Sequence, residues 1–326
     1  MLPLSFQRRI QSLLETTGDK PSLVAAREQL TERYRSKQGT ERGGFISSSE
    51  IIAYVAARLP ATFASIEAIL PHIPLKNISS VLDLGAGPGT AALASALYWP
   101  ECQKIHLIEG DAFMSEISQS LLKGLPELQH RQVSFQKANL LSVTIEASYD
   151  LVLLSYVLNE LAAHDQKVIL QKAWDSAEKG VIIVVPGTPI GYQHLMVLRD
   201  LLIEAGAFIA APCPHHEECP LKEGDWCHFS TRLLRPSFHR KIKDVSLPYE
   251  DEKYSYLVAL REPVPRPSAR IIRKPLQRSG HVTLDFCTPG GIKRQTISRR
   301  DKERYRLATK AVWGDGWDDN FTNEKE

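Results

Sequence analysis

Short apolar runs separated by longer mixed segments dominate the middle of the chain. Most of these runs lack the alternation of apolar and polar residues that marks a strand with one face in water. Continuous apolar strands are typical of a parallel sheet that helices cover on both faces. The pattern therefore predicts an α/β fold with a doubly wound sheet, whose five strands are Val81–Leu84, Lys104–Glu109, Val133–Phe135, Asp150–Leu154 and Val181–Val185.

The segment before this core has the apolar spacing of helices. Ser48 and Ser49 are placed to cap the helix that contains Ile51–Ala57. The polar, glycine-bearing residues 36–44 predict a loop. We therefore expect a helical N-terminal region at residues 1–75.

The pattern changes again after the fifth strand. Gly191–Ala205 has helical spacing, and Tyr254–Leu260 predicts a late strand. Three prolines between Pro263 and Pro267 then predict a stiff linker. The chain should thus divide into the helical region 1–75, a core at 76–262 with a cysteine-rich insertion at 211–230, and a basic region at 263–326.

A glycine-rich loop follows the first predicted strand. Asp83 ends that strand, and Gly85, Gly87 and Gly89 come next in the spacing G-x-G-x-G. Glycines at this place let the backbone turn tightly and approach a ligand closely. A dinucleotide fingerprint would have its third glycine where this chain has Thr90, which disfavours NAD. The loop resembles the S-adenosylmethionine site of class I methyltransferases, which have a Rossmann-like fold.

That resemblance implies roles for two further residues. Glu109 ends the second strand, where a carboxylate would accept hydrogen bonds from both ribose hydroxyls. Asn139 follows the third strand, where these enzymes often contact adenine. The expected cofactor-binding residues are therefore Asp83, Gly85, Gly87, Gly89, Glu109 and Asn139.

The catalytic residues are not defined by the sequence. Enzymes of this fold that methylate amines often carry Asn or Asp, two prolines and an aromatic residue after the fourth strand. This chain has Ser155–Glu160 there, without the prolines. Tyr156, Asn159 and Glu160 are the candidates at that place, and helix-start packing and capping explain them equally well.

Charge is unevenly distributed along the 326 residues, although the net charge is only +2. Residues 228–310 contain 20 Lys and Arg against 8 Asp and Glu, a net charge of +12. Such a segment could neutralise phosphates or could simply be a solvated face. No apolar run is long enough to cross a bilayer, and the first twenty residues resemble neither a signal nor a transit segment. We therefore expect no membrane partner and reduced cysteines.

Four of the five cysteines lie late in the chain, at Cys213, Cys219, Cys227 and Cys287. They lack the tight C-x2-C pairs of most zinc ribbons. Ligands from separated loops suit an iron–sulfur cluster better. A zinc site that includes His215, His216 or His228, and unliganded thiols, stay open as alternatives.

The order of motifs resembles the Rsm22 family, whose mitochondrial members are called methyltransferase-like seventeen. The resemblance implies that the four cysteines bind a 4Fe-4S cluster and that the chain acts in assembly of the small ribosomal subunit. One departure is Val185, where many relatives have glutamate. The matching segments are Ala56–Thr62, Leu82–Thr90, Pro186–Gly191, Cys213–His215, Cys219–Leu221, Trp226–Phe229, Glu250–Tyr256, Gly280–Val282 with Cys287, and Trp313–Asp315.

Together these features predict an S-adenosylmethionine-dependent rRNA methyltransferase, or a protein of that fold, with a structural cluster that ties an apolar-poor basic region to the core. The alternatives are a non-catalytic rRNA-binding assembly factor and a small-molecule methyltransferase with a zinc site. We expect a monomer in the bacterial cytoplasm, or in the mitochondrial matrix of a eukaryote. The expected RNA-binding residues are Arg270, Arg273, Lys274, Arg278, Lys293, Arg294, Arg299 and Arg300.

Overall fold

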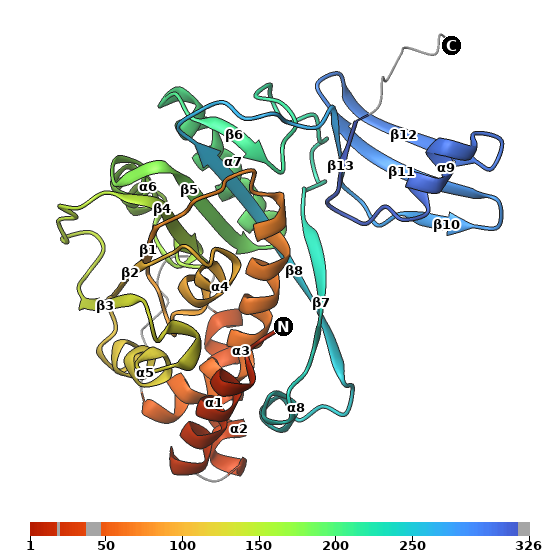
Figure 1. Cartoon of the computed structure of the whole chain (residues 1–326). Coiled ribbons are helices and arrows are strands. Elements are labelled where there is room, and N and C mark those ends of the chain that lie inside the picture. The colour runs from red at the N-terminus through yellow and green to blue at the C-terminus, as the bar shows by residue number, and fades with distance from the viewer. Residues whose placement is uncertain (18–19, 37–46, 319–326) are drawn as a thin grey trace. The chain divides into compact units, whose positions relative to one another are not determined.

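The computed structural model describes residues 1–17, 20–36 and 47–318 (Figure 1). The predicted loop at 36–44 lies outside these ranges except for its first residue. The chain forms two compact units. Unit 1 contains Met1–Pro71, Leu75–Val185 and Thr231–Glu252, and unit 2 contains His72–Pro74, Pro186–Ser230 and Lys253–Glu326. The units interleave along the chain, whereas the sequence suggested three consecutive stretches.

Unit 1 is built around five parallel strands in the order β3-β2-β1-β4-β5. Each strand contains one of the five predicted apolar runs, so the doubly wound sheet is confirmed. Burial on both faces explains why β1 and β4 are apolar almost throughout. The bounds are β1 (Ser80–Leu84), β2 (Lys104–Glu109), β3 (Gln132–Lys137), β4 (Tyr149–Ser155) and β5 (Ala177–Pro186).

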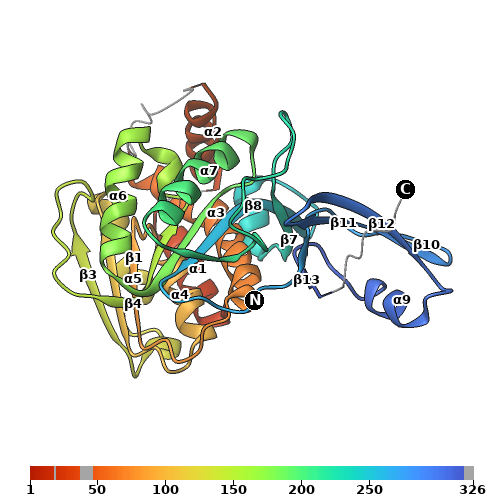
Figure 2. The same ribbon diagram turned by 90° about the horizontal axis from the view of Figure 1, so that it is seen from above.

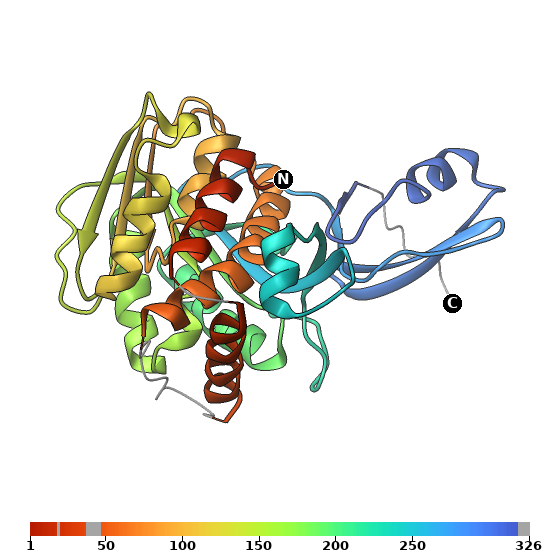
Figure 3. The same cartoon turned by 90° about the horizontal axis from the view of Figure 1, so that it is seen from below.

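Helices cover these strands (Figures 1 and 3). Helices α4 and α5 pack on β1, β2 and β3, and α6 packs on β4. Helices α1 and α2, which precede α3 in the chain, pack against it. Their bounds are α1 (Leu4–Thr17), α2 (Lys20–Ser36), α3 (Ser48–Ile69), α4 (Thr90–Tyr98), α5 (Ala112–Leu122) and α6 (Ala163–Asp175), with short 3-10 turns at Leu70–His72, Pro126–Leu128 and Leu158–Glu160.

The N-cap of helix α3 lies one residue earlier than expected. Ser47 is the N-cap, and its side chain accepts a hydrogen bond from the backbone N–H of Glu50. The prediction of Ser48 and Ser49 as caps was wrong, because both lie inside the first helical turn, after the N-cap position. The segment Ser48–His72 is long and apolar enough to cross a membrane, but 67% of its most apolar window is buried inside the protein.

The first long helix of unit 2 is α7 (Pro189–Glu204). Thr188 is its N-cap, and its side chain accepts a hydrogen bond from the N–H of Gly191. Strands β6 (Phe208–Ala211) and β8 (Tyr249–Leu260) pair antiparallel. The chain passes between the units within β7 (Phe229–Leu234) and β8, and helix α8 (Ser237–Lys243) lies between these strands in sequence.

The basic C-terminal region folds as a second, antiparallel sheet with helix α9 beside the β11–β12 hairpin (Figure 2). Burial alternates along β11, a period-two pattern that the sequence shows at Val282, Leu284 and Phe286. The elements are β9 (Ala269–Ile271), β10 (Leu276–Arg278), β11 (His281–Thr288), β12 (Gly291–Ser298), α9 (Lys302–Ala308) and β13 (Gly316–Trp317).

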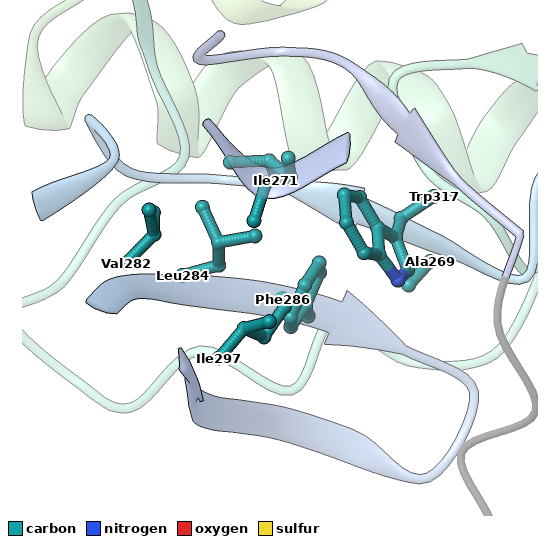
Figure 4. Close-up of a cluster of buried hydrophobic side chains, with 8 residues drawn as sticks. Ala269, Ile271, Val282, Leu284, Phe286, Ile297 and Trp317 are labelled. Carbon is teal, nitrogen blue, oxygen red and sulfur yellow. The ribbon is translucent and has the colours of Figure 1, made fainter. Parts of the chain in front are cut away.

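This second sheet has its own hydrophobic core, drawn in Figure 4. Phe286 and Trp317 pack with ring centroids 5.6 Å apart. The expectation that the region is poor in apolar packing was therefore wrong. The short alternating strands bury the apolar residues Ala269, Ile271, Val282, Leu284, Phe286, Ile297, Ala308 and Trp317.

Candidate cofactor site and cysteine pocket

Unit 1 contains a pocket of about 370 Å³ after the carboxyl ends of its parallel strands. This is the edge at which open α/β sheets bind their ligands. The volume lies within the range of small-molecule sites. Among the predicted cofactor residues, Gly85, Gly87, Glu109 and Asn139 line the pocket.

The glycine loop can be formed only by residues without a side chain. Gly85, Gly87 and Gly89 have φ values of 67°, 53° and 77°, in the left-handed region. A Cβ on Gly85 would also lie 2.3 Å from Cγ2 of Val157. The glycines therefore let the loop turn tightly against the chain that follows β4.

Glu109 is held beside this loop by backbone hydrogen bonds. Its Oε2 accepts from the N–H of Gly87 at 2.8 Å, and its Oε1 accepts from the N–H of Asp111 at 2.9 Å. Burial raises the pKa of Glu109, although these hydrogen bonds oppose the rise. Asn139 is fixed in a turn, where its Oδ1 accepts from the N–H of Leu141 at 2.8 Å. Both side chains thus present oxygen acceptors at the pocket.

Asp83 and Gly89 stand behind the loop rather than on the pocket wall. Asp83 is fully buried, and its Oδ2 accepts from the N–H of Ala92 in α4 at 3.0 Å. Its Oδ1 has no hydrogen-bond partner within the described residues. Burial raises the pKa of Asp83 to about 7. Asp83 therefore fixes the start of α4 and has no direct path to a ligand.

The three catalytic candidates separate in the structure. Tyr156 and Glu160 line the pocket, whereas Asn159 does not. Tyr156 has a φ of 60°, a conformation that non-glycine residues rarely adopt and that often marks functional sites. Its hydroxyl lies 3.1 Å from Oγ of Ser65 in α3. Val185, at the end of β5, is fully buried and offers no acid at this place.

Helix α3 contributes pocket residues that the sequence reading missed. Tyr54, Arg58 and Thr62 line the pocket at a spacing of four residues, which places them on one helical face. Nη2 of Arg58 pairs with Oε1 of Glu252 at 2.9 Å. The four-residue spacing in the sequence indicates that these side chains share a helical face. It does not indicate that this face lines the same pocket as the glycine loop.

Two hydroxyls on the pocket wall are buried and lack partners within the part of the chain that the structure describes. They are Oγ1 of Thr90 and Oγ of Ser155. Buried polar atoms are normally hydrogen-bonded. They could bind the polar groups of a ligand.

Unit 2 brings together the four late cysteines. Cys213, Cys219, Cys227 and Cys287 all line one largely apolar pocket. Burial and, to a smaller extent, the neighbouring thiols Cys213 and Cys219 raise the pKa of Cys287 to about 12. Across residues 1–17, 20–36 and 47–318, no three His, Cys, Asp or Glu side chains stand close enough to hold a metal ion without rearranging.

Donor groups adjoin the sulfur atoms of this pocket. The hydroxyl of Tyr192 donates to Sγ of Cys219 at 3.0 Å, and Nε2 of His215 lies 3.4 Å from Sγ of Cys287. His215, His216 and His228 are all absent from the pocket wall. Nε2 of His216 accepts from the N–H of Ile209 at 2.9 Å. The contact of His215 with Cys287 therefore makes it the best supported of the three as a neighbour of the sulfur atoms.

The predicted RNA-binding residues do not share one environment. Arg270 is only 4% exposed and donates to backbone carbonyls, so its expected place on an RNA-facing surface was wrong. Arg273 forms a short ion pair with Asp225, and Nε of Arg294 pairs with Oδ1 of Asp285 at 2.8 Å. Lys293 is half-buried. The exposed members are Lys274, Arg278, Arg294, Arg299 and Arg300.

The strand order and the loop at the end of β1 define the class of fold. Five parallel strands in the order β3-β2-β1-β4-β5, with a glycine loop leading into α4, form a class I methyltransferase fold. An O-methyltransferase family protein from Burkholderia thailandensis matches it with a TM-score of 0.50 and 13% identity, over 77% of this chain and 75% of that one. At this identity the likeness describes the fold alone.

The family follows from the sequence comparison. A family model described as "Mitochondrial small ribosomal subunit Rsm22" matches residues 48–318, so the chain belongs to the Rsm22 family. The resemblance inferred from the motifs is confirmed.

Named relatives are distant in sequence. "Rsm22-cox11 tandem protein 2, mitochondrial" from Schizosaccharomyces pombe is 26% identical over 83% of this chain and 43% of its own length. "Ribosome assembly protein METTL17, mitochondrial" from Homo sapiens is 26% identical over 96% of this chain and 73% of its own length. The chain therefore spans less than half of the fission-yeast relative.

The buried Asp83 predicts a pH dependence of stability. Its pKa is about 7 in the folded protein, against about 4 when unfolded. Between these values the folded state retains a proton that the unfolded state has lost, so stability falls as the pH rises from about 4 to 7. Asp83→Asn cannot ionise. As the pH rises from about 4 to 7, the free energy of unfolding of Asp83→Asn should therefore increase relative to that of the wild type.

Urea unfolding of the ligand-free proteins at a series of pH values measures this difference. Glu116→Gln, which removes an exposed carboxylate from α5, is the control and should run parallel to the wild type. Parallel curves for Asp83→Asn would contradict the assignment.

Proposed function

We propose that this chain is an S-adenosylmethionine-binding protein that acts on, or binds, small-subunit rRNA during ribosome assembly. The observation that carries the proposal is the match to the Rsm22 family over residues 48–318. The human relative is named a ribosome assembly protein, which supports the same role. The named relatives are mitochondrial, which supports the mitochondrial matrix as the location; the bacterial cytoplasm stays a prediction from the sequence.

The pocket of unit 1 supports cofactor binding. Glu109 and Asn139 both line the pocket. This supports our assignment of Glu109 to the ribose hydroxyls and of Asn139 to the adenine. The left-handed glycines leave room for the cofactor beside the backbone of Gly85 and Gly87. S-adenosylmethionine supplies an activated methyl group when bound.

Whether methyl transfer follows depends on residues around Tyr156 and Glu160. Both line the pocket, but no pair of prolines follows β4, and Val185 supplies no acid. A binding-only assembly factor is therefore the second candidate. It would bind cofactor and pre-ribosomal particles without methylating them.

The cysteine pocket supports a metal centre. Its four thiols come from separated segments of unit 2, and thiolates are ligands for iron–sulfur clusters and for zinc. Burying several thiolates together is unfavourable unless a cation compensates them. We favour a 4Fe-4S cluster held by Cys213, Cys219, Cys227 and Cys287, with a structural role that links α7, the 213–227 loop and β11.

A basic surface on the second sheet supports RNA binding. Arg278, Arg299 and Arg300 are exposed around its hairpin ends, and the turn that carries Arg300 leads into α9. Such side chains bind structured RNA through its phosphates. We expect the protein to bind RNA as a monomer.

Removing the Glu109 carboxylate should weaken cofactor binding. A hydrogen bond to a charged acceptor contributes about 1.5–3 kcal/mol, so Glu109→Ala should lower the affinity for S-adenosylhomocysteine about 10- to 100-fold. Isothermal titration calorimetry measures this. Glu116→Ala on α5 removes an exposed carboxylate outside the pocket and should bind like the wild type. Equal affinity of Glu109→Ala and Glu116→Ala would remove the cofactor assignment.

The metal centre is tested by chemical content. Protein purified without oxygen should contain about four irons and four acid-labile sulfides per chain, and Cys287→Ser should lose them. Cys102→Ser is the matched control, because Cys102 is buried but lies outside the cysteine pocket. One zinc without sulfide would overturn the cluster and return a small-molecule methyltransferase with a zinc site to contention.

Charge reversal tests the RNA surface. The double variant Arg299→Glu, Arg300→Glu should bind small-subunit rRNA more weakly and with a shallower salt dependence, because each lost phosphate contact removes about 0.9 from the slope of log affinity against log salt. Filter binding at several salt concentrations measures both. Arg8→Glu with Lys167→Glu makes the same charge change on exposed helices of unit 1 and should have the smaller effect. A larger loss of RNA affinity in the Arg8→Glu, Lys167→Glu variant would refute the assignment of Arg299 and Arg300 to the RNA-binding surface.

A further inference from the structure

Two arginines of unit 2 are buried, an unusual environment for this side chain. Arg199 on α7 is 2% exposed, and Arg270 on β9 is 4% exposed. Buried charges are normally paired with an opposite charge, since removing an ion from water costs several kcal/mol. The partner of each guanidinium group is therefore informative.

Arg270 has only neutral partners. Its Nε donates to the carbonyl oxygen of Pro212 at 2.8 Å, and its Nη1 donates to that of Gly314 at 3.0 Å. Among the described residues, no carboxylate lies within ion-pair distance of it. Arg270 is nevertheless part of the wall of the cysteine pocket. Its charge is thus directed at a pocket that contains thiols and no acid.

Arg199 does not line the pocket wall, but it holds the loop that follows Cys213. Its Nη2 donates to the carbonyl oxygens of His215 at 3.2 Å and Glu217 at 2.8 Å. Its carboxylate partner Asp200 is 3.0 Å away but is 64% exposed, so water screens that pair. The guanidinium group itself is held inside.

Both arginines lie beside the segment that carries Cys213. Arg270 donates to the carbonyl oxygen of the residue before Cys213, and Arg199 donates to carbonyl oxygens two and four residues after it. A positive charge near a sulfur atom favours its thiolate form.

We infer that Arg199 and Arg270 are the charge counterparts of an anionic metal–thiolate centre formed by the four cysteines, and that they set its retention and reduction potential. The inference rests on the metal centre proposed above. Four thiolates around a zinc ion or around an oxidised 4Fe-4S core leave a net charge of about −2. Two buried guanidinium groups would balance that charge.

The arginines are positioning residues and do not ligate the metal. Their backbone hydrogen bonds hold Pro212, His215 and Glu217, which flank Cys213 on both sides. Their charge stabilises the thiolates. Reduction of a cluster adds one more negative charge, so a buried cation nearby makes reduction easier and the potential less negative.

The test compares Arg270→Gln, which removes the charge, with Arg270→Lys, which retains it. Arg306→Gln removes an exposed arginine from α9 of the same unit and serves as the control. Full-length proteins are purified without oxygen. Metal and sulfide per chain, the rate of metal loss to a chelator, and the midpoint potential of any cluster are then measured.

We expect Arg270→Gln to lose its metal about ten-fold faster or more and, with a cluster, to have a more negative midpoint potential. Arg270→Lys and Arg306→Gln should stay near the wild type. Equal behaviour of Arg270→Gln and the wild type would overturn the inference. Equal defects in Arg270→Gln and Arg270→Lys would also overturn it, because they would indicate a packing role.

Arg199→Gln and Arg199→Lys provide a second, independent pair if Arg270→Gln does not fold. The same two readouts and the same contrast apply. Metal bound by the wild type, with no dependence on either arginine, would overturn this inference and leave the proposed centre intact. A wild-type protein without iron or zinc would overturn both.

Discussion

The left-handed glycine loop between β1 and α4 is the constraint on which the cofactor site depends. The loop must turn from a buried parallel strand into a buried helix while passing within contact distance of Val157. A side chain at Gly85 would collide there, so the chain after β4 and the loop can approach only because a Cβ is absent. This approach positions the pocket, to which Glu109 and Tyr156 contribute from neighbouring strand ends.

A different constraint governs the cysteine pocket. Four thiols line one pocket of unit 2, and Cys287, Arg199 and Arg270 are buried, although an ionised group is more stable in water. Unit 2 also has a separate hydrophobic core in its antiparallel sheet, around Phe286 and Trp317. The packing of the sheet is thus explained without a metal. The hydrophobic core of the sheet and the cysteine pocket are therefore separate features of unit 2.

Prediction from the sequence succeeded where the local pattern is strong. Continuous apolar runs identified all five parallel strands, because strands covered on both faces have few polar positions. The same approach missed the C-terminal strands, whose alternation is short and interrupted by turns and basic residues. It placed Arg270 on the surface because charge counts do not report burial.

By itself, the sequence determined the doubly wound sheet, the glycine loop, the family and the set of four clustered cysteines, since each depends on local periodicity or on motif spacing. Only the tertiary structure decided that Tyr54 and Arg58 face the pocket, that Asp83 lies behind it, and that Arg270 is buried beside the thiols. These facts depend on which distant segments pack together, and neither composition nor spacing along the chain specifies that packing.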